Sequence, residues 1–185
     1  MRVDYKGRMF SYISVSISLI ILIVLLLPYF APLFIVRGVA RGYISLLSYN
    51  IVFFEDHVKL SIYDSLFPVR VLHVCSVIVS ASYLLLFALR VKNTRKYRSL
   101  FYGILSLSIS LGITKGILLL IELEAKSLAK DLSRATSAGF LKIGEIRVEK
   151  TFLFHVINDY WLIFLALTIF ALIPAFCLAV KHSFK

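Results

Sequence analysis

The chain has 185 residues, of which 60% are hydrophobic, with a mean hydropathy of +0.90 and a net charge of +11. A soluble domain is about half apolar, so this composition excludes an ordinary soluble globular protein and predicts an integral membrane protein. The chain contains no Gln and little Met or Cys, a composition typical of proteins from hot environments. Its two cysteines, Cys75 and Cys177, are expected at different depths of the membrane and therefore as free thiols.

Four apolar runs reach the length of roughly 20 residues that a helix needs to cross a bilayer. They cover residues 9–36, 69–89, 100–121 and 160–180. The first run is too long for a cleaved signal peptide, so we expect an uncleaved signal-anchor helix. The predicted fold is a mainly α bundle of four transmembrane helices in a single membrane domain over residues 1–185, with extracytoplasmic loops at 37–68 and 122–159.

Basic residues in the short flanks predict that both termini are cytoplasmic, in a multi-pass protein of the cell membrane. These flanking residues are Arg2, Lys6 and Arg8, then Arg90, Lys92, Arg95, Lys96 and Arg98, then Lys181 and Lys185. In the two longer loops, by contrast, acidic residues balance the basic ones. We therefore expect the net positive charge to lie mainly in the cytoplasmic flanks, where it attracts anionic lipid headgroups. No nucleic acid partner is expected, because these short flanks contain no folded domain.

The first extracytoplasmic loop reads "YISLLSYNIVFFEDHVKLSIYD" and is rich in Ile, Val, Tyr and Phe. Its one polar break, "EDH", predicts a β-hairpin with strands near residues 43–54 and 57–63. In the second loop, Ile121, Ala125, Leu128 and Leu132 recur at helical spacing. The third helix is therefore expected to continue past the membrane to Ala138, with Gly139 as its C-cap.

Beyond Gly139 the chain alternates between polar and apolar residues from Glu145 to Glu149, with Ile146 and Val148 facing inward. This pattern predicts a third strand. Because an isolated hairpin is marginal in water, we expect this strand to complete a small extracytoplasmic sheet of about three strands.

A four-helix chain with cytoplasmic ends and two outer loops that share a small sheet resembles the claudin-type tetraspan proteins. The resemblance covers the whole chain at the level of topology. The Gly-Leu-Trp triplet and the cysteine pair that the family carries in its first outer loop do not occur here, and the one tryptophan is Trp161. The resemblance therefore implies a fold and transfers no functional residue.

Lys115 lies inside the apolar third helix, about 8 Å below its expected outer boundary. Its side chain is expected either to reach the outer rim, where Asp159 and Glu122 are candidate partners, or to place a functional cation in a polar cavity. Backbone carbonyls freed by Pro28 and Pro32 are a further candidate partner. A stripe of small residues, Ser108, Gly112 and Gly116, predicts close helix packing beside it.

The second helix carries a polar stripe at helical spacing, formed by His73, Ser76, Ser80 and Tyr83. Such a stripe either hydrogen-bonds to a neighbouring helix or lines a wet groove. His57, His73 and His155 lack the spacing by which one element supplies two metal ligands, so no metal site is expected. Nucleotide-binding and nucleophile-elbow motifs are absent, so we expect no enzymatic activity and no cofactor.

These features predict a non-enzymatic membrane protein that assembles with a second copy or with another envelope protein. The contact surface is expected to be the aromatic residues of the outer sheet, because large exposed apolar patches mark contact sites. They are Tyr43, Tyr49, Phe53, Phe54, Phe152 and Phe154. The alternative is a small transporter or a membrane-enzyme subunit that binds its substrate near Lys115, His73 and Tyr83.

Overall fold

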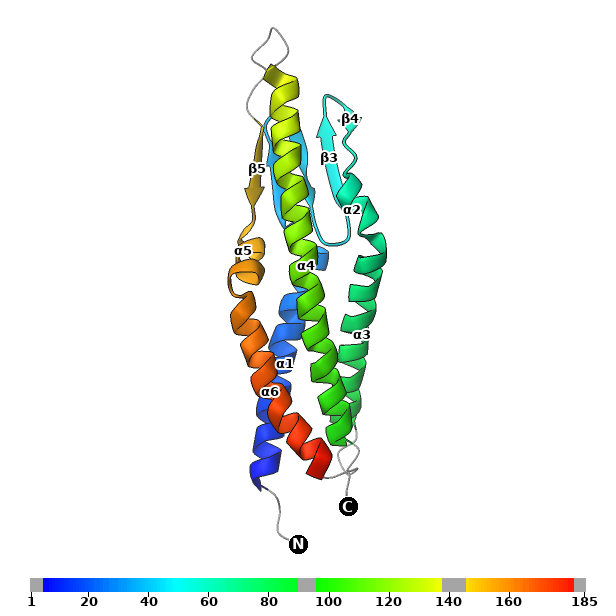
Figure 1. The fold of residues 1–185 in the computed structure, drawn as a ribbon, viewed down its shortest axis with the longest axis vertical. Helices are drawn as coiled ribbons and strands as arrows, with labels where there is room; N and C mark the ends of the chain where they lie inside the picture. The colour runs from blue at the N-terminus through cyan, green and yellow to red at the C-terminus, as the bar shows by residue number, and fades with distance from the viewer. Residues whose placement is uncertain (1–4, 90–95, 138–145, 182–185) are drawn as a thin grey trace. The chain divides into compact units, whose positions relative to one another are not determined.

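The computed structural model describes residues 5–89, 96–137 and 146–181. The described residues are mainly helical, with one small β-sheet (Figure 1). The helices are α1 (Tyr5–Phe30), α2 (Ser61–Ser65), α3 (Phe67–Leu89), α4 (Lys96–Ser137), α5 (Phe152–Asp159) and α6 (Trp161–Lys181). The strands are β1 (Phe34–Arg37), β2 (Ala40–Ile44), β3 (Tyr49–Phe53), β4 (Asp56–His57) and β5 (Arg147–Lys150).

Among the described residues, four helices are long and apolar enough to cross a membrane. These segments are Met9–Phe30, Phe67–Leu89, Lys96–Asp131 and Trp161–Lys181, close to the four runs predicted from the sequence. The basic connection at 90–95 and the C-cap predicted at Gly139 lie outside the described residues. Cys75 and Cys177 are both free thiols, as predicted.

Two compact units make up the chain. The helical unit comprises Met1–Leu25, Leu72–Thr114 and Trp161–Lys185, and the sheet unit comprises Leu26–Val71 and Lys115–Tyr160. Side chains from α1, α3, α4 and α6 form the core of the helical unit. The α4 residues of this core include Leu100, Ile104 and Leu107, which are fully buried.

The first helix ends at Phe30, six residues before the end predicted at Val36. Pro32 has no backbone N–H to continue the helix, and it disfavours helical geometry at Ala31. The chain then enters β1, where the β-branched residues Ile35 and Val36 favour an extended backbone. The last part of the first apolar run is therefore a strand of the sheet.

The sheet has five antiparallel strands in the order β4-β3-β2-β1-β5, rather than the three predicted. The strand predicted from the second loop is present as β5, and it pairs with β1 through Ile35↔Glu149 and its neighbours. Phe34, Ile44 and Ile51 are buried on one face, and they alternate with exposed residues such as Arg41 and Tyr43. The alternation gives the sheet one covered face and one open face.

The strand predicted over residues 43–54 is interrupted by a turn at Ser45–Ser48. The Ser45 hydroxyl donates to the Ser48 carbonyl at 2.8 Å and accepts from the Ser48 amide at 3.1 Å. Serine hydroxyls compete in this way with ladder hydrogen bonds, which ends the strand. The second predicted strand, 57–63, is also wrong after His57, because residues 61–65 form the helix α2.

As predicted, the third long helix continues well beyond the length of a membrane span, and α4 ends at Ser137. Its continuation belongs to the sheet unit, and Figure 1 shows it running across the sheet. Glu122 on α4 forms an ion pair with Lys150 on β5 at 2.8 Å. Glu122 also pairs with Lys126 at 2.9 Å within the helix. The contact with Lys150 ties the helix to the edge strand of the sheet.

Candidate functional site

The β3–β4 hairpin ends in a two-residue turn that is unusual in composition. Phe53 pairs with Asp56, so Phe54 and Glu55 occupy the turn. Both have positive φ angles, 48° for Phe54 and 74° for Glu55. A type I′ turn requires this geometry, and Asn-Gly normally supplies it, whereas a bulky residue there is strained by about 1–3 kcal/mol.

The aromatic residue at this turn is exposed. The Phe54 side chain is 55% exposed, and its ring packs edge-on against Phe53, with the ring centroids 4.6 Å apart. Glu55 and Asp56 beside it are exposed as well. Phe53, Phe54, Glu55 and Asp56 together are called the hairpin tip. The tip thus combines an aromatic pair with two carboxylates on a strained turn.

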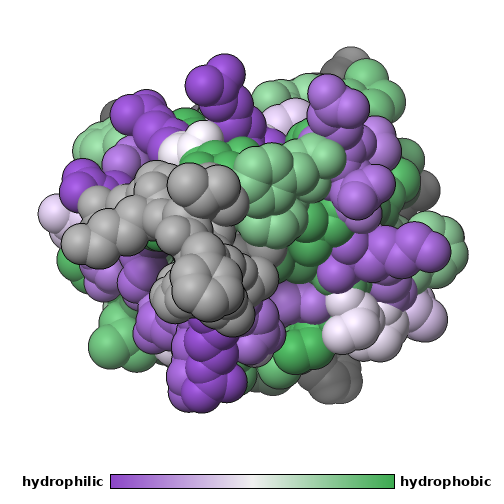
Figure 2. Space-filling view, turned by 90° about the horizontal axis from the view of Figure 1, so that it is seen from above, coloured by the Kyte–Doolittle hydropathy of each residue, from purple (hydrophilic) through white to green (hydrophobic). Residues whose placement is uncertain are grey.

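The surface seen from above mixes polar and apolar side chains. Figure 2 shows hydrophilic side chains there, interspersed with smaller hydrophobic patches. Such a mixture is typical of a surface in contact with water, where single exposed apolar side chains are common. Exposure of one aromatic residue is therefore informative only where its backbone or its neighbours are unusual, as at the hairpin tip.

Five of the six aromatic residues predicted as a contact surface divide into exposed and structural groups, and the sixth, Phe53, is half-buried at the hairpin tip. Tyr43 is 41% exposed and Phe152 is 84% exposed, so with Phe54 they form the exposed group. Phe154 is fully buried and packs against Phe34, with ring centroids 4.8 Å apart. The Tyr49 hydroxyl donates to Asp64 at 3.2 Å and accepts from the Leu60 amide at 3.1 Å. Phe154 and Tyr49 therefore hold the sheet unit together and are not free for a partner.

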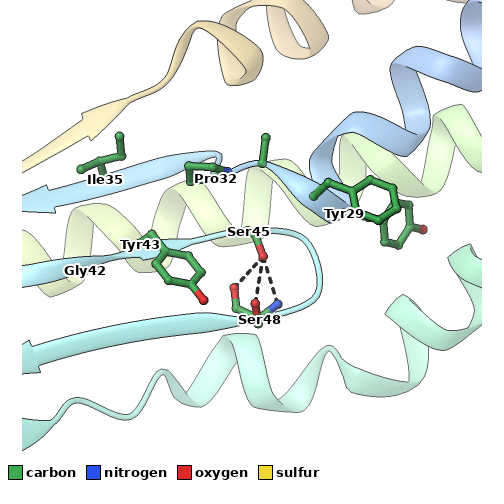
Figure 3. Close-up of a pocket in the computed structure, with 9 residues that line it drawn as sticks. Tyr29, Pro32, Ile35, Gly42, Tyr43, Ser45 and Ser48 are labelled. Carbon is green, nitrogen blue, oxygen red and sulfur yellow. Dashed lines mark hydrogen bonds between the residues drawn. The ribbon is translucent and has the colours of Figure 1, made fainter.

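A groove of about 420 Å³ lies on the open sheet face, beside the end of α1 (Figure 3). Tyr29, Pro32, Ile35 and Tyr43 line it together with the Ser45–Ser48 turn. The lining has apolar and hydroxyl groups and no charged side chain among the described residues.

Lys115 forms hydrogen bonds within the sheet unit to Asn158, a residue that the sequence analysis did not predict as its partner. Its Nζ donates to the side-chain oxygen of Asn158 at 2.6 Å and to the backbone carbonyl of Asn158 at 3.3 Å. Among the described contacts, neither of the acidic partners predicted for it meets the ammonium directly. Glu122 pairs with Lys126 and Lys150 instead.

Asp159 is hydrogen-bonded to Asn158, the residue that binds Lys115. The Asn158 amide donates to Asp159 at 2.9 Å, and His155 contacts the same carboxylate at 3.1 Å. These hydrogen bonds, with the Asn158 contribution the larger, hold the pKa of Asp159 below its ordinary value. Asp159 thus orients the amide that binds Lys115, and it remains exposed itself.

The polar stripe of α3 is hydrogen-bonded to α4 within the helical unit. His73 is fully buried, and its Nε2 lies 2.8 Å from the Thr114 hydroxyl. The Ser76 and Ser110 hydroxyls lie 2.7 Å apart, and Ser80 donates to the Gly103 carbonyl at 2.9 Å. Tyr83 is half-buried and its ring lies 5.7 Å from that of Tyr102. The arrangement corresponds to the helix-packing interpretation of this stripe.

The close contact between α3 and α4 occurs at Gly103 rather than at the predicted small-residue stripe. A Cβ at Gly103 would meet the Leu84 side chain at 3.2 Å. A Cβ at Gly112 or at Gly116 would meet nothing within 4 Å among the described residues. Ser108 is half-buried and donates to the Ile104 carbonyl of its own helix. In the part of the chain that the structure describes, the stripe faces no other helix.

Two buried charged residues of the sheet unit were missed by the sequence analysis. Glu124 is 6% exposed and accepts hydrogen bonds from the backbone of α2. Arg70 is 8% exposed; its guanidinium lies 3.9 Å from the centre of the Tyr63 ring and donates to the Leu47 carbonyl at 3.2 Å. Sequence patterns mark neither residue, because their partners are backbone groups and a ring distant along the chain.

The described residues contain no group of three or more His, Cys, Asp or Glu side chains placed to hold a metal ion. His155 contacts Asp159, and His57 lies at the end of the edge strand β4. The features that stand out are therefore the hairpin tip and the open sheet face. Comparison of the chain with protein-family models, with curated proteins and with solved structures found no match.

Proposed function

We propose that this chain is a non-enzymatic integral membrane protein that acts in protein assembly at the cell envelope. In this proposal the four apolar helices span the membrane, and both termini are cytoplasmic because the basic segments at 2–8, 90–98 and 181–185 are retained there. The same basic residues attract anionic lipid headgroups. The sheet unit then lies on the extracytoplasmic side and carries the contact surface.

Exposed aromatic residues near the ends of the apolar helices support this placement. Phe30 at the end of α1 is 87% exposed, Phe67 at the start of α3 is 63% exposed, and Tyr160 just before α6 is 54% exposed. Tyr is enriched at membrane–water interfaces, and the wholly apolar Phe rings are suited to contact with the adjacent acyl chains. Phe152 belongs with them, because Thr151 beside it donates to the Pro32 carbonyl at 2.8 Å, near the end of α1. We assign Phe152 to the lipid interface rather than to a protein contact.

The single observation that carries the assembly proposal is the exposure of Phe54 on a strained turn. A strained backbone persists where the surrounding structure or a function requires it. Exposed aromatic side chains with few conformations are efficient contacts for a protein partner. The two edges of the sheet are less suited to docking, because β4 has only two residues and β5 carries Arg147, Glu149 and Lys150.

The test compares two exposed phenylalanines in native membranes. Phe54→Ser is expected to reduce crosslinking and co-purification of the protein's partner by roughly fivefold or more, with normal insertion and expression. Phe152→Ser, the matched control, is expected to leave association unchanged because Phe152 faces lipid. Equal association of the wild type and the Phe54→Ser variant would refute the assembly surface.

Orientation is tested separately by single cysteines in a background without Cys75 and Cys177. Ser61→Cys and Arg147→Cys should react with an impermeant reagent from outside, and Asn93→Cys only after permeabilisation. Labelling of Asn93→Cys in intact cells would invert the topology. The extracytoplasmic placement of the contact surface would then be wrong.

The alternative, a transporter or membrane-enzyme subunit near Lys115, His73 and Tyr83, has weaker support. His73 and the serines of α3 are engaged by α4, and Lys115 is engaged by Asn158. Transport sites usually expose such groups to a water-filled path. We therefore retain assembly as the proposed function.

A further inference from the structure

The open face of the sheet changes from neutral to cationic along two neighbouring strands. Ile35 on β1 pairs with Tyr43 on β2, and both line the groove beside the end of α1. Arg37 and Arg41 each lie two residues from one member of this pair. Side chains at that spacing on a strand point to the same face, so both arginines lie on the open face directly beyond the groove.

The two arginines are neighbours across the strands, and we call Arg37 and Arg41 the arginine pair. Val36 pairs with Gly42, so the next position along both strands brings Arg37 beside Arg41. Neighbours of this kind have Cβ atoms about 4.5–5.5 Å apart, and like charges there destabilise a sheet. One anion between the two guanidinium groups would contact both and relieve their repulsion.

Both members of the arginine pair are accessible to an anion. Arg41 is exposed, and none of the ion pairs found among the described residues involves it. Arg37 lies 3.5 Å from Glu149, and their side chains are 65% and 47% exposed. Such a pair is weak, because water and salt screen it. Glu149 also carries only one negative charge, so it cannot neutralise both arginines.

The groove offers contacts of a different kind, aromatic rings beside hydroxyls. Its volume of about 420 Å³ lies within the range of small-molecule sites. Figure 3 shows Tyr43 beside the Ser45–Ser48 turn, and no hydrogen bond joins its hydroxyl to the other residues drawn. Ser48 is exposed, and its hydroxyl lies 3.2 Å from that of Ser45. Such a lining suits a group that has both apolar C–H faces and several hydroxyls, as a sugar or another polyol does.

The groove also adjoins the part of α1 that faces lipid in the proposed membrane placement. Phe30, which we assign to the lipid interface, is one of the residues that line the groove. One turn earlier on the helix, Leu26 and Leu27 are exposed as well. Lipid tails are as apolar as these side chains and can pack against them. A ligand in the groove can therefore keep acyl chains of its own in the bilayer beside Phe30.

The order of these contacts indicates which kind of lipid fits. Beyond Phe30 the sheet presents first the groove and then, two residues or roughly 7 Å further along the strands, the arginine pair. In an ordinary phospholipid the phosphate follows the glycerol directly, so it precedes any hydroxylated headgroup. A lipid whose hydroxylated headgroup carries an acidic group at its outer end matches the order on the sheet.

We propose that the open sheet face binds one such membrane lipid, with its acyl chains beside Phe30, its hydroxylated headgroup in the groove and its outer acidic group at the arginine pair. Guanidinium groups bind phosphate and carboxylate through paired hydrogen bonds, so either acid suits the pair. The inference rests on the proposed membrane placement of α1. It does not depend on the assembly surface, because no residue of the hairpin tip takes part.

Other occupants match fewer of these observations. A free anion would contact the arginine pair and leave the groove and Phe30 without a role. A protein segment in the groove would displace the acyl chains that Phe30 is placed to contact. One lipid accounts for the apolar, hydroxylated and cationic parts of this face together.

The test uses a phosphatidylinositol phosphate as the probe, because its inositol ring is a polyol that carries an outer phosphate. The full-length protein in mild detergent receives the probe, phosphatidylinositol without the outer phosphate, or phosphatidylglycerol, each at the same mole fraction. A lipid that binds the folded protein raises its melting temperature. The probe is expected to give the largest rise, phosphatidylinositol a smaller one and phosphatidylglycerol the smallest.

Variants of the arginine pair and of the groove should affect different parts of this response. Arg37→Gln combined with Arg41→Gln should remove the extra rise that the outer phosphate gives, so that the probe and phosphatidylinositol become equal. Tyr43→Ala should reduce the rise from both inositol lipids by roughly half or more. Tyr43→Phe keeps the ring and the fold, and should retain more of the rise than Tyr43→Ala.

The matched control removes two exposed charges elsewhere in the sheet unit. Lys59→Gln combined with Arg134→Gln should leave the rises from all three lipids unchanged. Loss of the probe's extra rise in this control would show attraction by net charge alone and overturn the site. An unchanged extra rise in the arginine-pair variant would overturn it equally.

Two further additions separate a lipid from a soluble anion and from an ordinary phospholipid. Inorganic phosphate and the deacylated headgroup of the probe should give little rise at the concentration at which the probe saturates. A rise from either that equals the rise from the probe would overturn a membrane lipid as the occupant. Equal rises from phosphatidylglycerol and the probe would overturn the extended headgroup.

A photo-crosslinking phenylalanine analogue at position 43, activated in native membranes, examines the natural occupant. The expected adduct is a lipid with an acidic headgroup, identified by mass spectrometry. A protein adduct, or a lipid without an acidic group, would overturn the inference. The result is independent of position 54: a lipid adduct at 43 supports this site even if Phe54→Ser refutes the assembly surface, and a protein adduct at 43 overturns this site while the assembly function stands.

Discussion

The carboxylate of Glu124 on α4 accepts two backbone hydrogen bonds, one from the Tyr63 amide at 2.6 Å and one from the Ile62 amide at 2.8 Å. These amides belong to the first turn of α2, whose N-cap residue, Leu60, has no side chain able to cap it. A helix normally satisfies these donors with a Ser, Thr, Asp or Asn at the N-cap. Here a residue distant along the chain does so, and it ties α2 to α4.

Removing this cap should destabilise the sheet unit. Glu124→Ala is expected to lower the free energy of unfolding by about 1–3 kcal/mol, because one buried and one part-buried backbone amide lose a charged acceptor. Glu124→Gln keeps one acceptor and should lose less. Thermal unfolding in mild detergent measures the loss, and amide exchange at Ile62 and Tyr63 locates it. Asp131→Ala, at an exposed position on the same helix, should change little, and an equal loss there would contradict the capping role.

Alkaline pH should destabilise the protein through Tyr63. Burial raises the pKa of Tyr63 from 10.0 to about 12, against the opposing effect of Arg70. Its hydroxyl donates to the Ser45 carbonyl at 3.2 Å, which requires the neutral phenol. The folded-state pKa lies above the unfolded value, so this stability is present below the unfolded value of 10.0 and is lost as the pH rises toward about 12.

The corresponding experiment compares the melting temperature of the wild type with that of Tyr63→Phe between about pH 9 and about pH 12. The variant lacks the ionisable group, so its melting temperature should fall less over this interval. Tyr43→Phe, at an exposed tyrosine, serves as the control and should keep the wild-type slope. The assignment fails if Tyr63→Phe shows the full wild-type decrease.

Lys115 and Asn158 should behave as a coupled pair. Lys115→Leu is expected to leave insertion intact and to reduce stability by about 1 kcal/mol, because one hydrogen-bonded ammonium is replaced by an apolar side chain. Adding Asn158→Leu should cost less than the sum of the two single changes, since they remove the same contact. Lys126→Leu is the exposed control. Additive losses, or loss of partner binding with the fold intact, would mean that Lys115 acts elsewhere.

Two glycines of α4 should respond in opposite directions to alanine. Gly103→Ala brings a Cβ within 3.2 Å of Leu84 and should destabilise the helical unit. Gly112→Ala meets nothing within 4 Å and should gain up to about 1 kcal/mol from helix propensity. Thermal unfolding of the two variants in the same detergent tests both expectations. A destabilising Gly112→Ala would show that the open face of this helix is covered by a partner that survives purification.

Regular patterns allowed part of this fold to be predicted. Helical spacing of Ala125 and Leu128 predicted the long extension of α4, and alternation around Val148 predicted β5. Both signals are local to one element. By contrast, β1 lies inside an apolar run that continues from α1, and hydropathy alone does not separate a buried strand from a helix end.

The remaining differences come from contacts between distant parts of the chain. Residues 61–65 are helical with the help of Glu124, and the turn at Ser45–Ser48 depends on a hydroxyl that composition does not mark. Asn158 was missed as the partner of Lys115 because a cation in an apolar helix suggests a carboxylate partner before an amide. The aromatic set was partly wrong, since Phe154 fills the core while Phe54 is exposed. Sequence alone does not distinguish these two roles.

The central claim is that the hairpin tip contacts a protein while the aromatic residues near the span ends contact lipid. A photo-crosslinking phenylalanine analogue at position 54, activated in intact cells, tests it most directly, with the same analogue at position 152 as the matched control. The account predicts a discrete protein adduct from position 54 and lipid adducts from position 152. An inserted, well-expressed protein that gives no protein adduct at position 54, or gives lipid adducts there, would contradict it.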